Sequence, residues 1–174
     1  MGLRELPRLA ADALKLAPQI KKLAQRWSEV RDVMFIGRAL GFPIAMEGAL
    51  KLKELSYVHA EGYAAGELKH GPIALLDPHT PLVAVATRGA TYEKVVSNIA
   101  EVRAREAPVV AVATEGDEEI DRYAQDVLFV PPTLEELAPV VAILPLQLLA
   151  YEVAVARGTD VDQPRNLAKS VTVE

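Results

Sequence analysis

The sequence predicts an α/β protein in which a doubly wound parallel sheet lies between two layers of helices. Four short apolar runs have the length and composition of strands buried on both faces, at residues 33–37, 82–86, 109–113 and 127–130. Segments with apolar residues at helical spacing separate these runs. Strands that alternate with helices are typical of a parallel sheet covered on both faces, so we predict a three-layer αβα architecture.

The composition limits the class of protein. A chain of 174 residues with 51% hydrophobic residues and a mean hydropathy of +0.14 can form one domain with a sizeable core. The net charge is −5, and no basic tract is interleaved with aromatic residues, so we expect no nucleic-acid partner. The absence of cysteine excludes disulfides and thiol catalysis and removes the usual structural zinc ligands. We expect no metal and no organic cofactor.

The sequence gives no signal for export or for a membrane. Arg4, Glu5, Arg8 and Asp12 interrupt the N-terminus, which therefore lacks the apolar core of a signal peptide. We expect no stretch to approach the length and hydropathy of a membrane span. A chain without cysteine is also compatible with a reducing compartment, so a cytoplasmic location is expected.

Helical segments are predicted before, between and after the strands. Apolar residues at helical spacing predict one or two amphipathic helices within residues 1–30, which form a separate N-terminal helical segment. Residues 92–105 form a second helical pattern, and residues 115–125 can hold a short helix. The spacing Thr133-x-x-Glu136 predicts a capping box for a last helix that ends at Gly158, with Pro139 and Pro145 starting or kinking it. Residues 31–158 then form the main domain, and residues 159–174 form an irregular tail.

The segment 44–58 predicts a helix with an unusual distribution of charge. Its apolar residues spread around most of the circumference, whereas Glu47, Lys51 and Glu54 share one narrow strip. A largely apolar helix is normally buried, which favours a strip that faces a pocket or an interface. The spacing from Glu47 to Lys51 is also that of an ordinary ion pair on a solvated helix, so both interpretations remain open.

The helix is followed by a segment rich in glycine and in titratable side chains. Gly62, Gly66 and the Gly71–Pro72 pair break the helical pattern and place Glu67, Lys69 and His70 in irregular backbone. Binding and catalytic residues are disproportionately found in such segments. We therefore expect the functional site to include residues from this part of the chain.

Two motifs resemble one family of enzymes. The segment MEGALKLKELSYVHAEGYAAGELKHGP resembles the signature of the second sugar-isomerase (SIS) domain of the glutamine:fructose-6-phosphate amidotransferases, and DQPRNLAKSVTVE resembles their C-terminal tail. The resemblance covers essentially the whole chain, but nothing in it corresponds to the family's glutaminase domain or first SIS domain. It implies a flavodoxin-like SIS fold and the conversion of fructose 6-phosphate to glucosamine 6-phosphate.

The resemblance also implies three catalytic residues. Glu54 matches the glutamate that transfers a proton between C1 and C2, a role for which burial would have to raise its basicity; the alternative is a plain ion pair with Lys51. His70 matches the ring-opening histidine, which the family's neighbouring subunit contributes, so a homodimer is implied. Lys169 matches the lysine that forms a Schiff base with the sugar, whereas a lysine near a terminus is otherwise usually exposed.

The resemblance places three further residues, Glu47, Lys51 and Ala168, around the same sugar. The chain lacks the hydroxyl-rich loop that usually holds a phosphate ester, since residues 37–41 contain no serine or threonine, and Arg38 alone is weak evidence for an anion site. We therefore expect little activity from the chain alone. The alternative function is a non-catalytic SIS module that binds a phosphosugar as a sensor or serves in assembly.

Overall fold

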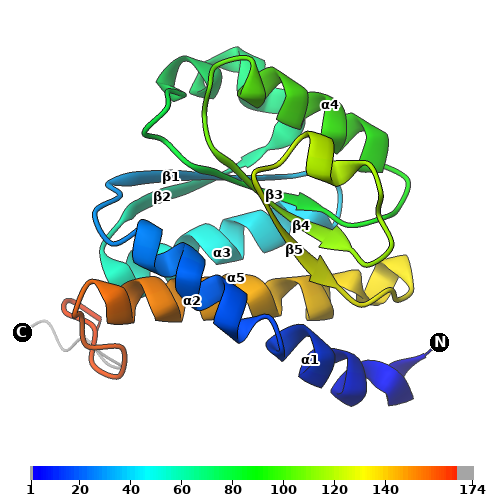
Figure 1. Ribbon diagram of the computed structural model, residues 1–174, viewed down its shortest axis with the longest axis horizontal. Helices are drawn as coiled ribbons and strands as arrows, with labels where there is room; N and C mark the ends of the chain where they lie inside the picture. Colours follow the sequence, from blue (N-terminus) through cyan, green and yellow to red (C-terminus); the bar gives the residue numbers. More distant parts are fainter. Residues whose placement is uncertain (1, 168–174) are drawn as a thin grey trace, which may run out of the picture.

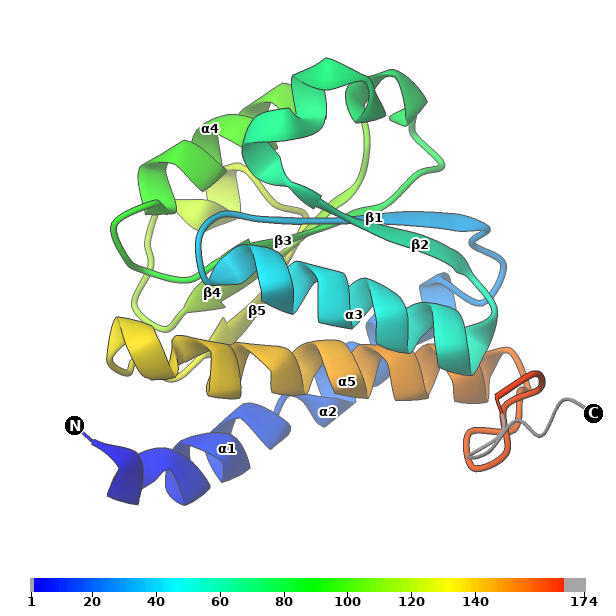
Figure 2. The same ribbon diagram turned by 180° about the vertical axis from the view of Figure 1, so that it is seen from behind.

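A computed structural model describes residues 2–167 of the chain. It contains a five-stranded parallel sheet with the strand order β2-β1-β3-β4-β5, as shown in Figures 1 and 2. The doubly wound α/β architecture predicted from the sequence is therefore confirmed. The strands are β1 (Asp32–Gly37), β2 (His59–Ala64), β3 (Leu82–Ala86), β4 (Val109–Thr114) and β5 (Asp126–Val130).

Helices cover both faces of the sheet. One layer holds α3 and α5 with α1 and α2 packed outside them, and the other holds α4 with three short 3₁₀ helices (Figure 1). The α-helices are α1 (Leu6–Leu14), α2 (Ala17–Arg26), α3 (Gly41–Ser56), α4 (Tyr92–Arg103) and α5 (Ala138–Ala156), and the 3₁₀ helices of the α4 layer are η2 (Ala65–His70), η3 (Pro72–Leu75) and η4 (Ile120–Arg122).

The alternation of side chains along each strand creates two separate cores. In β1, Val33 and Phe35 point into the core under α3 and α5, whereas Met34 and Ile36 point into the core under α4. Strands β3 and β4 divide their residues in the same way and are buried along their whole length. This is why the sequence shows these strands as continuous apolar runs.

Strand β2 does not have such a run, and the sequence analysis missed it. It is the edge strand beside β1, and only Ala60 among its six residues is fully buried. Its remaining residues include His59, Glu61 and Gly62, which are typical of an edge rather than of a central strand. The segment expected to be irregular therefore begins with a strand, and the irregular backbone starts at η2.

Helix α5 starts later than the sequence predicts. A 3₁₀ helix, η5 (Glu135–Leu137), precedes it, and Leu137 is the N-cap residue, so the predicted capping box of Thr133 and Glu136 is wrong. The Thr133 hydroxyl makes no hydrogen bond. Pro139 lies in the first turn, as expected, because its missing N–H has no partner to lose there.

The helical stretch Glu135–Ala156 also differs from the expectation about membranes, because its length and its mean hydropathy of 1.8 are those of a spanning helix. In the structure it is the central helix of its layer and packs against α1, α2 and α3. Leu146, Leu149 and Val153 are each about 1% exposed in that core. Their burial among other helices accounts for the apolar residues on this face of the helix, whereas Val140 and Val155 are exposed.

Glycine 62 sets the distance between β2 and α3. A Cβ added at this residue would lie 2.7 Å from the Cα of Met46, which is backbone and not a movable side chain. We expect Gly62→Ala to lower the free energy of unfolding by about 1–3 kcal/mol, because the strand and the helix must move apart. Urea unfolding measures this loss.

Gly2→Ala is the control for this substitution, since no atom lies within 4 Å of its added Cβ. The control should change stability by less than about 0.5 kcal/mol. A Gly62→Ala variant as stable as the control would contradict the close approach of β2 and α3.

Candidate active site

Helix α3 carries the predicted strip of charge on its surface. The Nζ of Lys51 lies 2.7 Å from the Glu54 carboxylate and 3.8 Å from that of Glu47. The three side chains are 32%, 27% and 40% exposed in the order Lys51, Glu54 and Glu47. Within one chain, the strip is therefore ion-paired and only partly buried, and Glu54 does not have the buried environment that the sequence analysis expects for a base.

The hydrogen bond from Lys51 to Glu54 raises the pKa of the lysine. The pairing with Glu54 is the largest cause of this shift, and the charge of Glu47 adds to it. Lys51 therefore remains an ammonium at neutral pH and cannot act as the nucleophilic amine of a Schiff base. Its chemistry is limited to holding Glu54 in place and to attracting negative groups.

The turn that carries His70 follows the carboxyl end of β2. His70 is 70% exposed, and its Nδ1 lies 2.7 Å from a carboxylate oxygen of Glu67. When Nδ1 donates to Glu67, the other ring nitrogen, Nε2, becomes a proton acceptor. The sequence analysis did not identify Glu67 as the partner of His70, although their i, i+3 spacing in a short helical turn is a signal for it.

A polar network ties this turn to helix α4. The Nζ of Lys69 lies 2.8 Å from Glu101, whose carboxylate also accepts a hydrogen bond from Asn98 at 3.4 Å. Asn98 is 7% exposed and accepts a hydrogen bond of 3.0 Å from the Nε of Arg38. Lys69, the residue before His70, is thus bound to α4. Asn98 of α4 is in turn bound to Arg38 in the loop after β1.

Glu54 and His70 lie at opposite ends of the strands. Because α3 runs antiparallel to the strands, its C-terminal end, with Glu54, lies where β1 and β2 begin. His70 follows the carboxyl end of β2, which is six residues long and therefore spans roughly 17 Å. Figure 2 shows α3 along this whole length. One chain does not bring these two predicted site residues together.

The C-terminal tail lies beside the end of α3 that carries Glu54 (Figure 1). The Thr159 hydroxyl is 2.7 Å from the carbonyl of Leu55, and the backbone N–H of Arg165 donates a hydrogen bond of 2.7 Å to the Tyr57 hydroxyl. The Arg165 guanidinium also lies over the Tyr57 ring. The predicted residues Ala168 and Lys169 lie outside the described residues.

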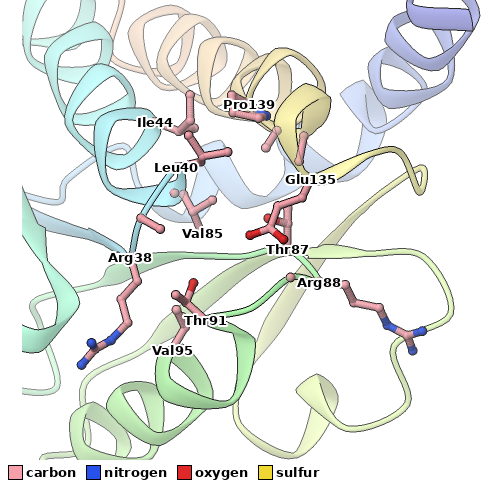
Figure 3. A pocket seen from close by; sticks show the side chains of 15 residues that line it. Arg38, Leu40, Ile44, Val85, Thr87, Arg88, Thr91, Val95, Glu135 and Pro139 are labelled. Atoms are coloured by element: carbon pink, nitrogen blue, oxygen red, sulfur yellow. The ribbon is translucent and has the colours of Figure 1, made fainter. Parts of the chain in front are cut away.

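A narrow crevice lies between the carboxyl ends of β1 and β3, where ligands of doubly wound sheets usually bind (Figure 3). It has room for little more than a water molecule. Glu135 points its carboxylate into the crevice, and Ala90 at the start of α4 donates a long hydrogen bond of 3.4 Å to it.

The cationic groups around the crevice point away from it (Figure 3). Arg38 is bound to Asn98, and Arg88 donates a hydrogen bond to the carbonyl of Gly116. The start of α4, which would attract an anion, therefore faces the carboxylate of Glu135 instead. This crevice is unsuited to a phosphate group.

Within residues 2–167, no three His, Asp or Glu side chains come together in a way that could hold a metal ion. The chemistry available from the described residues is proton transfer by carboxylate and imidazole groups.

The network around Glu101 gives a pH-dependent prediction. The hydrogen bond from Lys69 lowers the pKa of Glu101 below its ordinary value of 4.5, so the pair stabilises the fold above that value and loses its effect as the pH falls through the folded-state pKa. At neutral pH, Glu101→Gln should lower the free energy of unfolding by less than about 1 kcal/mol, since Lys69 is exposed.

Urea unfolding of both proteins between about pH 7 and pH 3 measures this difference, which should shrink below pH 4.5. Lys69→Met is the matched background, in which Glu101→Gln should have a smaller effect at neutral pH. A difference between wild type and variant that grows as the pH falls would contradict the pairing.

Comparison with known proteins identifies the family. A model of the SIS domain matches residues 27–157. The glutamine–fructose-6-phosphate aminotransferases of Thermus thermophilus and Methanosarcina acetivorans are 60% and 59% identical over 172 residues, which cover 99% of this chain and 28% of each relative. The solved C-terminal domain of glucosamine-fructose-6-phosphate aminotransferase from Francisella tularensis is 42% identical, with a TM-score of 0.87 over 92% of this chain and 45% of that one. The chain therefore belongs to the SIS domain family and matches the C-terminal SIS domain of these aminotransferases.

Proposed function

We propose that this chain supplies the second isomerase half of a glucosamine-6-phosphate synthase, which converts fructose 6-phosphate and glutamine to glucosamine 6-phosphate in the cytoplasm. Lys169 forms a Schiff base with the C2 carbonyl of the open-chain sugar and releases water, and ammonia derived from glutamine then displaces the lysine amine from C2. Glu54 moves a proton between C1 and C2, and His70 moves the proton that opens the sugar ring. Glu47, Lys51 and Ala168 line the site, and no cofactor takes part.

The contact between the tail and α3 is the observation that carries this proposal. Thr159 and Arg165 are bound to Leu55 and Tyr57, which follow Glu54 by one and three residues. Lys169 follows Leu167 by two residues, and an extended chain covers about 7 Å in two residues. The described part of the tail therefore lies at the end of α3 that carries Glu54, which supports the proposal that Lys169 acts beside Glu54.

The separation of His70 from Glu54 supports a site shared between two copies of the chain. Ring opening and proton transfer act on adjacent carbon atoms of one sugar, so their catalysts must lie within hydrogen-bonding distance of the same molecule. Because β2 separates the two residues within one chain, we propose that a symmetric homodimer places His70 of one copy beside Glu54 of the other.

The phosphate group of the sugar needs a further partner. The crevice at the carboxyl ends of β1 and β3 presents the carboxylate of Glu135, and the guanidinium groups of Arg38 and Arg88 point away from it (Figure 3). We propose that another domain holds the phosphate, and that the chain alone shows little turnover because the substrate is poorly positioned. The chain spans 28% of the length of its aminotransferase relatives, which is compatible with this division of roles.

Chemical trapping tests the role of Lys169 in the complete natural protein. Borohydride reduction in the presence of fructose 6-phosphate should attach the sugar to Lys169 of the wild type and to no residue in Lys169→Arg. Peptide mapping by mass spectrometry locates the label. Lys53→Arg, which changes an exposed lysine of α3, is the control and should keep the label.

The same assay distinguishes the role of Glu54 from that of Lys169, and it distinguishes an enzyme from a non-catalytic sensor. Glu54→Gln should keep the label on Lys169 but reduce the formation of glucose 6-phosphate from fructose 6-phosphate by about 10²–10⁴-fold, since it loses only the base. Saturable binding of fructose 6-phosphate by the wild type without any label would instead support the sensor.

Complementation tests the shared site. Glu54→Gln and His70→Ala variants of the complete protein should each be inactive, whereas an equal mixture that exchanges subunits should regain about a quarter of wild-type activity, because half of the dimers are mixed and each of these has one intact site. Activity is measured after refolding the variants together. A mixture that stays inactive, although mass spectrometry detects mixed dimers, would contradict the shared site.

A further inference from the structure

Two side-chain contacts hold the start of the tail against the ends of the long helices. The Thr159 hydroxyl lies 2.7 Å from the carbonyl of Leu55 in α3 and 3.1 Å from that of Ala154 in α5. It therefore connects two helix ends whose last carbonyls lack partners within the helix. Thr159 fixes where the tail begins, but it lies ten residues before Lys169.

Tyr57 makes the second attachment, closer to Lys169. Its hydroxyl accepts a 2.7 Å hydrogen bond from the backbone N–H of Arg165, and the Arg165 guanidinium lies 4.1 Å from the centre of its ring. The ring thus binds both the backbone and the side chain of one residue, 108 positions away in the sequence. A cation over an aromatic ring is attracted to the electrons of its face.

The backbone of Tyr57 is unusual for so large a residue. Tyr57 is the C-cap of α3 and has a left-handed conformation with φ of +59°. Glycine or asparagine is the usual residue in this conformation, because a side chain crowds the backbone there. The left-handed conformation also turns the chain between α3 and β2 while the ring remains at the end of α3. The contact between the Tyr57 ring and Arg165 gives a reason for a bulky residue at this position, although the backbone conformation disfavours one.

We propose that Tyr57 is a positioning residue that holds the tail, through Arg165, where Lys169 can reach the sugar beside Glu54. This inference rests on the proposed function. Arg165 and Asn166 are exposed, so the attachment is at the surface, where each of its interactions is weak. Together the two interactions favour the docked position of the described part of the tail.

Three variants separate the parts of this contact. Tyr57→Phe removes the hydroxyl that accepts the Arg165 N–H and keeps the ring, and Arg165→Met removes the guanidinium and keeps the N–H. Tyr57→Gly removes the whole contact and suits the left-handed backbone, so it should fold at least as well as the wild type. Thr159→Val is the matched control, which removes a tail contact that does not involve the ring.

Hydrogen exchange of the tail amides measures docking in the complete natural protein, and steady-state kinetics measures its effect on catalysis. We expect Tyr57→Gly to exchange the amide of Arg165 at least about tenfold faster and to lower kcat about ten- to a hundredfold with a smaller change in KM. Tyr57→Phe and Arg165→Met should be intermediate in both measurements. Thr159→Val should leave the exchange of the Arg165 amide closer to wild type than Tyr57→Gly does.

The outcomes distinguish this inference from the proposed function. Unchanged exchange in Tyr57→Gly would overturn the attachment itself, and faster exchange with unchanged kcat would overturn its positioning role. If borohydride places no sugar on Lys169 of the wild type, the proposed function fails and the positioning role fails with it. Faster exchange in the variant would then show that the attachment exists without that role.

Discussion

Strand β2 imposes the constraint on which the account of this domain depends. It runs from the end of α3, near Glu54, to the turn that carries His70, so these residues lie at opposite ends of the strand. The close contact of Gly62 with the backbone of Met46 keeps the strand directly against α3. The strand therefore keeps the two residues apart within one chain, which is the reason for proposing a site shared between two copies.

The two ends of the sheet serve different purposes in this arrangement. The amino end holds the ion-paired strip of α3 and the attached tail, and the carboxyl end holds the turn with Glu67, Lys69 and His70. The crevice at the carboxyl end, which is the usual ligand site of doubly wound sheets, contains the carboxylate of Glu135. The site proposed here therefore lies away from the position that fold analogy alone would favour.

The sequence was sufficient to predict the layers, the central strands and the edge strand β5, but not the edge strand β2. Strands β1, β3 and β4 are buried on both faces, so burial selects continuous apolar runs that are visible in the sequence. Strand β2 has one covered edge, and its identity depends on pairing with β1 rather than on its own residues. The start of α5 was mispredicted because Glu135 contacts the start of α4, a tertiary interaction that a local capping pattern does not reveal.

The sequence could indicate which residues belong to the candidate site, but not the contacts that these residues make. The spacing of Glu47, Lys51 and Glu54 correctly placed them on one face of a helix, and it left open whether they form ion pairs or face a pocket. In the structure Lys51 pairs with both glutamates and all three side chains are partly exposed. The contact of Tyr57 with Arg165 joins residues 108 positions apart, and no periodic pattern predicts it. The left-handed conformation of Tyr57 is likewise a consequence of the turn from α3 into β2.

A crystal structure of the complete natural protein with fructose 6-phosphate bound would test the central claim most directly. The account predicts one sugar within hydrogen-bonding distance of Glu54 and bonded to Lys169 of one copy, with the imidazole of His70 from a neighbouring copy at the ring oxygen. A sugar bound far from Glu54, or a site completed by Glu54 and His70 of the same copy, would contradict it.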